Sequence, residues 1–139
     1  EKLSSPLPET EALIGYLYRV AETGNPYARL GYSYWAESVY GFTNTSRTIF
    51  QELLKLKDNQ MTFLVAHAKI DEDHFEDIKI TLSRFCKTDA DWQAVEECML
   101  QTLAMTGKVM DQVIGQYLDI LDGKPSRYGF LQELEYSTK

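Results

Sequence analysis

The chain has 139 residues, of which 44% are hydrophobic and 25% charged, as is typical of one folded domain, here expected over residues 1–139. Its net charge of -7 and its scattered lysines and arginines argue against nucleic acid or an anionic membrane surface as a partner, because both ligands select a basic face. Cys86 and Cys98 are too few for a disulfide framework, so we expect two reduced thiols in a cytoplasmic protein.

Helical periodicity of apolar residues runs through the sequence, and no alternating apolar run predicts a strand. The first predicted helix covers residues 8–23. The dipeptide Asn25-Pro26 is typical of a helix start and predicts a second helix that ends near residue 41. A third helix is predicted over residues 45–56.

Two longer helices are predicted in the second half of the chain. The fourth covers residues 61–85 as one unbroken apolar stripe. The fifth starts at Thr88, where Asp91 three residues later makes a capping box, and runs to Leu121. One short helical turn is expected at residues 131–134. Helices of this length with short connections predict an all-α bundle of mostly antiparallel neighbours.

The chain has only two histidines, His67 and His74, and both lie in the fourth predicted helix with Asp71 between them. Positions i, i+4 and i+7 fall within about 60° of one another, so the three side chains project from one helical face. Imidazole plus carboxylate is a ligand set expected for iron or manganese. The alternative is that the histidines are solvent-facing or hydrogen-bonded core residues, with Asp71 as an ion partner. The ladder spacing on an amphipathic helix favours a metal. We also expect the ladder to be buried, because apolar residues flank its face, namely Phe63, Ile70, Ile78, Leu82 and Phe85.

Glu37 is the only charged residue between Leu30 and Phe42, so we expect its carboxylate to be buried and to need a partner. Arg29 or Arg47 could be that partner. Because the two histidines are expected nearby, we favour a metal ion, and we place the carboxylate close to the histidine-bearing face.

Tyr34 and Tyr40 lie three residues on either side of Glu37. A phenol beside an oxidising iron can donate an electron or a proton, which makes both tyrosines weak candidates for a catalytic role. Packing in an aromatic core is the commoner role of such a residue.

Together these segments resemble the haem-oxygenase-like diiron oxidases, the iron-containing redox enzymes related to TenA and PqqC. Like that family, the chain has a helix with small, aromatic and Glu residues, followed about thirty residues later by H-x-x-x-D-x-x-H. The matching residues are Glu37, His67, Asp71 and His74, and the resemblance covers residues 16–121. It implies a haem-oxygenase-like, TenA-like helical bundle that holds two iron ions, with manganese as an alternative metal.

The resemblance further implies an oxidoreductase that activates dioxygen on a small-molecule substrate. In that family a further Glu and His come from an earlier helix, which here would lie upstream of Glu1. We therefore expect the working protein to include additional N-terminal helices, in the same chain or an associated fragment, or to form a homodimer. The alternative is a non-catalytic helical module that binds a small molecule or a partner protein and carries a vestigial metal site.

Overall fold

The computed structural model describes residues 5–128, and of residues 40–44 and 68–72 it describes the backbone but not the side chains. Over residues 5–128 the chain is all-α and contains no strand, as the periodicity predicts. None of the described helices is both long and apolar enough to cross a lipid bilayer. The elements are α1 (Pro8–Glu22), α2 (Leu30–Ser38), α3 (Tyr40–Leu54), the 3₁₀ helix η1 (Asp58–Gln60), α4 (Thr62–Phe85) and α5 (Asp89–Leu121).

Three of the predicted helices are confirmed almost residue for residue, namely α1, α4 and α5. α5 begins at the predicted capping box, in which Thr88 Oγ1 accepts a hydrogen bond from the backbone N–H of Asp91 at 3.2 Å. α1 is followed by Gly24 at φ +83°, a left-handed conformation that glycine adopts without a steric cost. The turn predicted at residues 131–134 lies outside the described residues.

The bounds of the second and third predicted helices are wrong. Asn25 starts only a series of turns, in which its Oδ1 accepts a hydrogen bond from the N–H of Tyr27 at 2.8 Å, and α2 begins five residues later at Leu30. A single non-helical residue, Val39, separates α2 from α3, which begins at Tyr40 instead of residue 45. Gly, Thr and Asn between these positions have weak helical preference, and packing of α3 against α4 overrides it.

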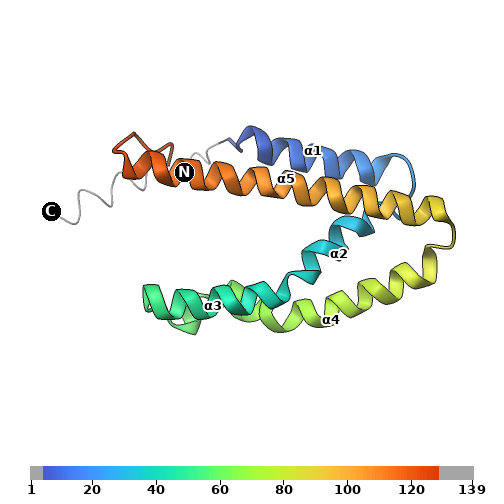
Figure 1. Ribbon diagram of the computed structural model, residues 1–139, viewed down its shortest axis with the longest axis horizontal. Coiled ribbons are helices and arrows are strands. Elements are labelled where there is room, and N and C mark those ends of the chain that lie inside the picture. The colour runs from blue at the N-terminus through green and yellow to red at the C-terminus, as the bar shows by residue number, and fades with distance from the viewer. Residues whose placement is uncertain (1–4, 129–139) are drawn as a thin grey trace.

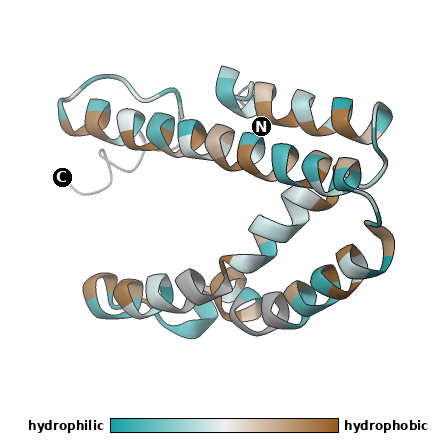
Figure 2. Cartoon of the chain, turned by 45° about the vertical axis from the view of Figure 1, so that its right-hand side comes forward, coloured by the Kyte–Doolittle hydropathy of each residue, from teal (hydrophilic) through white to brown (hydrophobic). Residues whose placement is uncertain are grey.

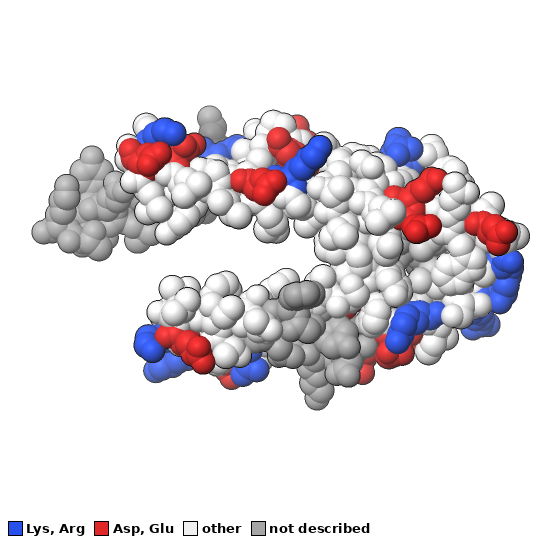
Figure 3. All heavy atoms as spheres, viewed as in Figure 1, with Lys and Arg blue, Asp and Glu red and all other residues white. Residues whose placement is uncertain are grey.

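The helices form two layers joined by α2 (Figure 1). α1 and α5 lie antiparallel in one layer, α3 and α4 lie antiparallel in the other, and α2 crosses between them in contact with α4 and α5. The layers meet at the turn between α4 and α5 and diverge toward the other end. The space-filling view shows the gap between α3 and the C-terminal half of α5 as a wide hollow, which we call the notch (Figure 3). The predicted bundle is therefore open on one side.

The small hydrophobic core lies where α2 crosses α4 and α5. Leu82, Cys86 and Val95 are buried together there. The residues packed against them are Tyr27, Leu30, Tyr34 and Ile78. Cys86 and Cys98 are both free and buried, and burial raises the pKa of the Cys86 thiol, which disfavours the reactive thiolate. The expectation of two unbridged thiols is confirmed.

Thr102 ties α5 to α2. The residue is fully buried, its Oγ1 accepts a hydrogen bond from Trp35 Nε1–H at 2.7 Å, and its hydroxyl donates to the carbonyl of Cys98 at 2.7 Å. Replacing Thr102 by Val keeps the volume but leaves the indole N–H without its acceptor. We expect Thr102→Val to lower the free energy of unfolding by about 1–3 kcal/mol, measured by urea denaturation. Thr102→Ser keeps the hydroxyl and serves as the control, and an equal loss in both variants would contradict this assignment.

Asp91 holds the turn between the layers. Its Oδ2 accepts hydrogen bonds from the backbone N–H groups of Lys87 at 3.1 Å and Thr88 at 3.0 Å, and its Oδ1 accepts one from Asn25 Nδ2 at 2.7 Å. The hydrogen bond from Asn25 is the strongest influence on the pKa of Asp91, followed by those from the Thr88 hydroxyl, which donates to Oδ2 at 2.8 Å, and from the Thr88 backbone. Together with the bond from Lys87 they lower this pKa to about 2 from an ordinary 3.8.

This depressed pKa predicts an acid sensitivity. Because the folded state holds the Asp91 carboxylate at a lower pKa than the unfolded chain does, its stabilising effect is present above pH 3.8 and is lost as the pH falls toward 2. We expect the stability of Asp91→Asn to vary less with pH over that window than the wild-type stability does. Urea denaturation at a series of pH values measures this, with Asp89→Asn in the same turn as the control. Parallel curves for wild type and Asp91→Asn would refute the prediction.

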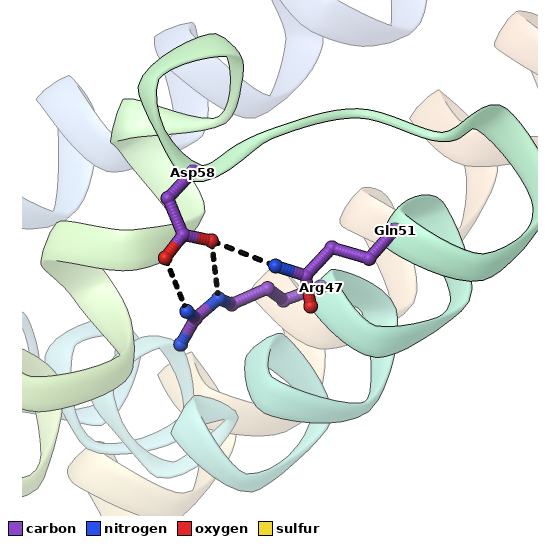
Figure 4. Close-up of polar contacts among 3 residues, drawn as sticks. All are labelled: Arg47, Gln51 and Asp58. Atoms are coloured by element: carbon purple, nitrogen blue, oxygen red, sulfur yellow. Dashed lines mark hydrogen bonds and ion pairs between the residues drawn. The ribbon is translucent and has the colours of Figure 1, made fainter.

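A smaller polar cluster fixes η1 to α3 (Figure 4). Arg47 Nη2 lies 2.7 Å from Asp58 Oδ2, and Gln51 Nε2 donates to Asp58 Oδ1 at 2.7 Å. The cluster therefore sets how the chain turns from α3 into α4, the helix that carries both histidines.

Candidate metal site

Glu37 and His74 meet where α2 packs against α4. Glu37 Oε2 lies 3.4 Å from His74 Nδ1, and the side chains are 29% and 55% exposed. The two residues are far apart in the sequence, and the contact between α2 and α4 brings them together. The predicted closeness of the Glu37 carboxylate to the histidine-bearing face is therefore confirmed at His74.

His67 lies two helical turns before His74 on α4. Its ring stacks on that of Phe63, with centroids 3.9 Å apart and planes inclined at 26°. His67 Nδ1 lies 2.9 Å from the carbonyl oxygen of Phe63, and in the tautomer protonated at Nδ1 it donates to that oxygen. Nε2 then keeps its lone pair, which is the usual arrangement of an imidazole that binds a metal.

Asp71, the third member of the predicted ladder, has a side chain outside the description. Its backbone belongs to α4 between the two histidines, so the helical spacing of the ladder is as expected. Among the side chains that the structure describes, no group of three His, Cys, Asp or Glu residues is placed to hold a metal ion. The ligand roles of all four residues therefore stay predictions.

The two arginines considered as partners of Glu37 make other contacts. Arg47 pairs with Asp58, as described above. Arg29 Nη1 donates to Ser33 Oγ at 3.3 Å. The Arg29 guanidinium carbon lies over the Tyr32 ring, 4.7 Å from the ring centroid. The described contact of Glu37 is with His74 instead.

The expected burial of the ladder is wrong for the chain as it stands. Phe63 is 67% exposed, Phe85 is also exposed, and Glu37 is only half-buried. Of the flanking apolar residues expected to shield the ladder, Leu82 is buried by the contact with α2. The reason is that the described contacts of α4 are mainly with α2 and α3, together with the short η1 beside its start, and they cover only part of the helix.

Tyr34 is placed by packing, and Tyr40 has a side chain outside the description. The Tyr34 ring lies 5.2 Å from that of Phe75 on α4. Tyr34 also lines a cavity of about 470 Å³ between α2, α4 and α5, which the sequence did not reveal. The other lining residues are Lys79, Leu82, Ser83, Trp92, Val95, Glu96 and Met99. The lining residues of α4 lie on one face of that helix, and those of α5 lie on one face of α5. These two faces enclose a cavity only because α2 crosses between them.

Compared with protein-family models, with curated proteins and with solved structures, the chain gives no match. The resemblance to the diiron oxidases therefore depends on the motif around Glu37 and on the histidine ladder alone. Over residues 5–128 the structure establishes an all-α arrangement.

Proposed function

We propose that this chain contributes Glu37, His67, Asp71 and His74 to a non-haem diiron, or iron–manganese, site of an oxidoreductase that acts on a small molecule with dioxygen. The observation that carries the proposal is the 3.4 Å approach of Glu37 Oε2 to His74 Nδ1 across two helices. A carboxylate and an imidazole so close can share one cation, and both are ligand types that iron accepts.

The remaining residues fit the same donor set. His67 can keep Nε2 free because Nδ1 lies against a backbone carbonyl, and Asp71 belongs to the same helix between the histidines. Bound iron would supply the redox chemistry with dioxygen, and the chain would position the ions and balance their charge with two carboxylates. A complete haem-oxygenase-like bundle would draw a further Glu and His from additional helices.

The cavity beside Tyr34 is our candidate for binding part of the substrate. Its volume of about 470 Å³ lies in the range of small-molecule sites, and most of its lining side chains are apolar. Lys79 and Glu96 are among the lining residues and offer polar contacts that would orient a small molecule.

One observation favours a non-catalytic helical module as the second candidate. The Glu37 carboxylate and the His74 imidazole lie close enough, at 3.4 Å, to form an ion pair whenever the imidazole carries a proton, and that contact needs no metal. In that case the chain would bind a small molecule or a partner protein through its cavity or its apolar surface.

Metal retention separates the two functions. The chain is loaded anaerobically with Fe(II), desalted and analysed for iron, and its dioxygen uptake is then followed with an oxygen electrode. The oxidoreductase proposal expects iron retained in near-stoichiometric amount and consumption of dioxygen on mixing. Protein that folds but retains no iron or manganese would leave the helical module as the function.

A further inference from the structure

The cavity beside Tyr34 lies at the closed end of the molecule, where the two layers meet, and not in the notch (Figure 1). Leu82 and Val95 of the buried core are among its lining residues, so part of its wall is apolar. Hydrophobic positions near the turn between α4 and α5 can be followed in Figure 2. With a volume of about 470 Å³, the cavity has room for a small molecule that has an apolar body.

Two aromatic rings from different helices border this cavity, Tyr34 on α2 and Trp92 on α5. The face of an aromatic ring attracts a cation that lies within about 6 Å of its centroid, and indole does so most strongly. No lysine or arginine of the described chain lies over either ring. Trp92 is 45% exposed, so part of its ring is open to a ligand. The two rings therefore suit a ligand that carries a positive charge.

The charged residues of the lining, Lys79 and Glu96, differ in their partners. Lys79 forms an ion pair with Glu76 on its own helix, and its Nζ lies over the Phe75 ring, 5.0 Å from the centroid. Glu96 makes no hydrogen bond or ion pair within the part of the chain that the structure describes. It follows Trp92 by four residues on α5, so the carboxylate and the indole are neighbours on one helical face. The charge of the lining that lacks a described partner is therefore negative.

We propose that this cavity binds a small organic cation, namely an amine or a quaternary ammonium group joined to an apolar body. The positive charge lies between the Glu96 carboxylate and the Trp92 indole. The apolar body lies against Leu82, Val95 and Met99, where the Met99 thioether adds a polarizable contact. An anion would instead bring its charge close to the Glu96 carboxylate, which repels it.

As a statement about the substrate, this inference rests on the proposed oxidoreductase function. As a statement about what the cavity binds, it concerns the metal-free chain and is tested on that chain. The lining residues that carry it are not among the four proposed metal ligands.

Three ligands with the same phenyl body test the sign of the charge. At neutral pH 2-phenylethylamine is a cation, 2-phenylethanol is neutral and 3-phenylpropionate is an anion. NMR titration follows the indole N–H signals of Trp35 and Trp92, the two tryptophans of the chain, and Trp92→Phe assigns them. We expect the amine to shift the Trp92 signal with about tenfold higher affinity than the alcohol. The Trp35 signal should stay in place, because its N–H is bound to Thr102 outside the cavity.

A pair of adjacent glutamates tests the residue. Glu96→Gln keeps the shape of the side chain and removes its charge, so it is expected to lower the affinity for the amine about tenfold and to leave that for the alcohol unchanged. Glu97→Gln is the matched control, because Glu97 is equally exposed but does not line this cavity. It is expected to bind the amine as the wild type does. Circular dichroism checks that both variants keep the wild-type helical signal.

Several outcomes would overturn the inference. These are equal affinity for the three ligands, a preference for 3-phenylpropionate, no shift of the Trp92 signal at millimolar ligand, and an amine affinity that Glu96→Gln leaves unchanged. Iron retention is measured separately and keeps the two proposals apart. Amine binding by a chain that retains no iron would support the cation site and remove the oxidoreductase. Iron retention without amine binding would do the reverse.

Discussion

Replacing Gly31 with alanine is expected to lower the free energy of unfolding by about 3 kcal/mol or more, the upper part of the range for overpacking. A Cβ at this position would lie 2.0 Å from the carbonyl oxygen of Val95 and 2.8 Å from the backbone nitrogen of Met99. Both atoms belong to the backbone of α5, which cannot rotate away as a side chain can. α2 would have to move off α5, and the buried hydrogen bond from Trp35 to Thr102 would stretch.

Gly15 provides the matched control for this substitution. It lies within α1, and a Cβ there would meet nothing within 4 Å. Gly15→Ala is therefore expected to raise the stability by about 0.5–1 kcal/mol through helical preference alone. Urea denaturation followed by circular dichroism measures both variants. Wild-type stability in Gly31→Ala would show that α2 and α5 do not approach as closely as described.

Removal of any ladder residue is expected to reduce iron binding sharply. His67→Ala, Asp71→Ala and His74→Ala each delete a proposed ligand, and Glu37→Gln deletes the negative charge opposite His74. Loss of an outer-shell partner alone costs about 10–100-fold in metal affinity, so loss of a direct ligand should cost at least that much. The helical signal should change little, because the described members of the ladder are not buried in the core.

The control for these variants is Asp73→Asn. Asp73 is an exposed carboxylate next to His74 in the sequence, and its helical position points it away from the ladder. Iron content after anaerobic loading and desalting is measured for all five variants. If the three ladder variants and Glu37→Gln bind as much iron as Asp73→Asn does, these four residues do not form a metal site.

The sequence predicted those parts of the fold that depend on local chemistry. The stripe of α4 and the capping box of Thr88 and Asp91 are confirmed because periodicity and caps act within one helix. The boundary between α2 and α3 was placed wrongly at residues 41–45, because contacts with α4 extend α3 over residues of weak helical preference. Burial of the ladder was also predicted wrongly, since burial depends on how far other helices cover α4.

The candidate site shows the same division. The lone carboxylate of Glu37 in an apolar helix predicted that it lies near the histidines, and the structure places it beside His74. The cavity at Tyr34 was missed because its lining comes from three helices whose crossing no local pattern encodes.

The most direct test of the account is anomalous X-ray diffraction at the iron absorption edge, from crystals of the chain loaded anaerobically with Fe(II). The account predicts an anomalous peak between the Glu37 carboxylate and the His74 imidazole, on the side of α4 that also carries His67. Iron found elsewhere on the chain, or clear density for a direct Glu37–His74 contact with no anomalous peak beside it, would contradict the proposed metal site.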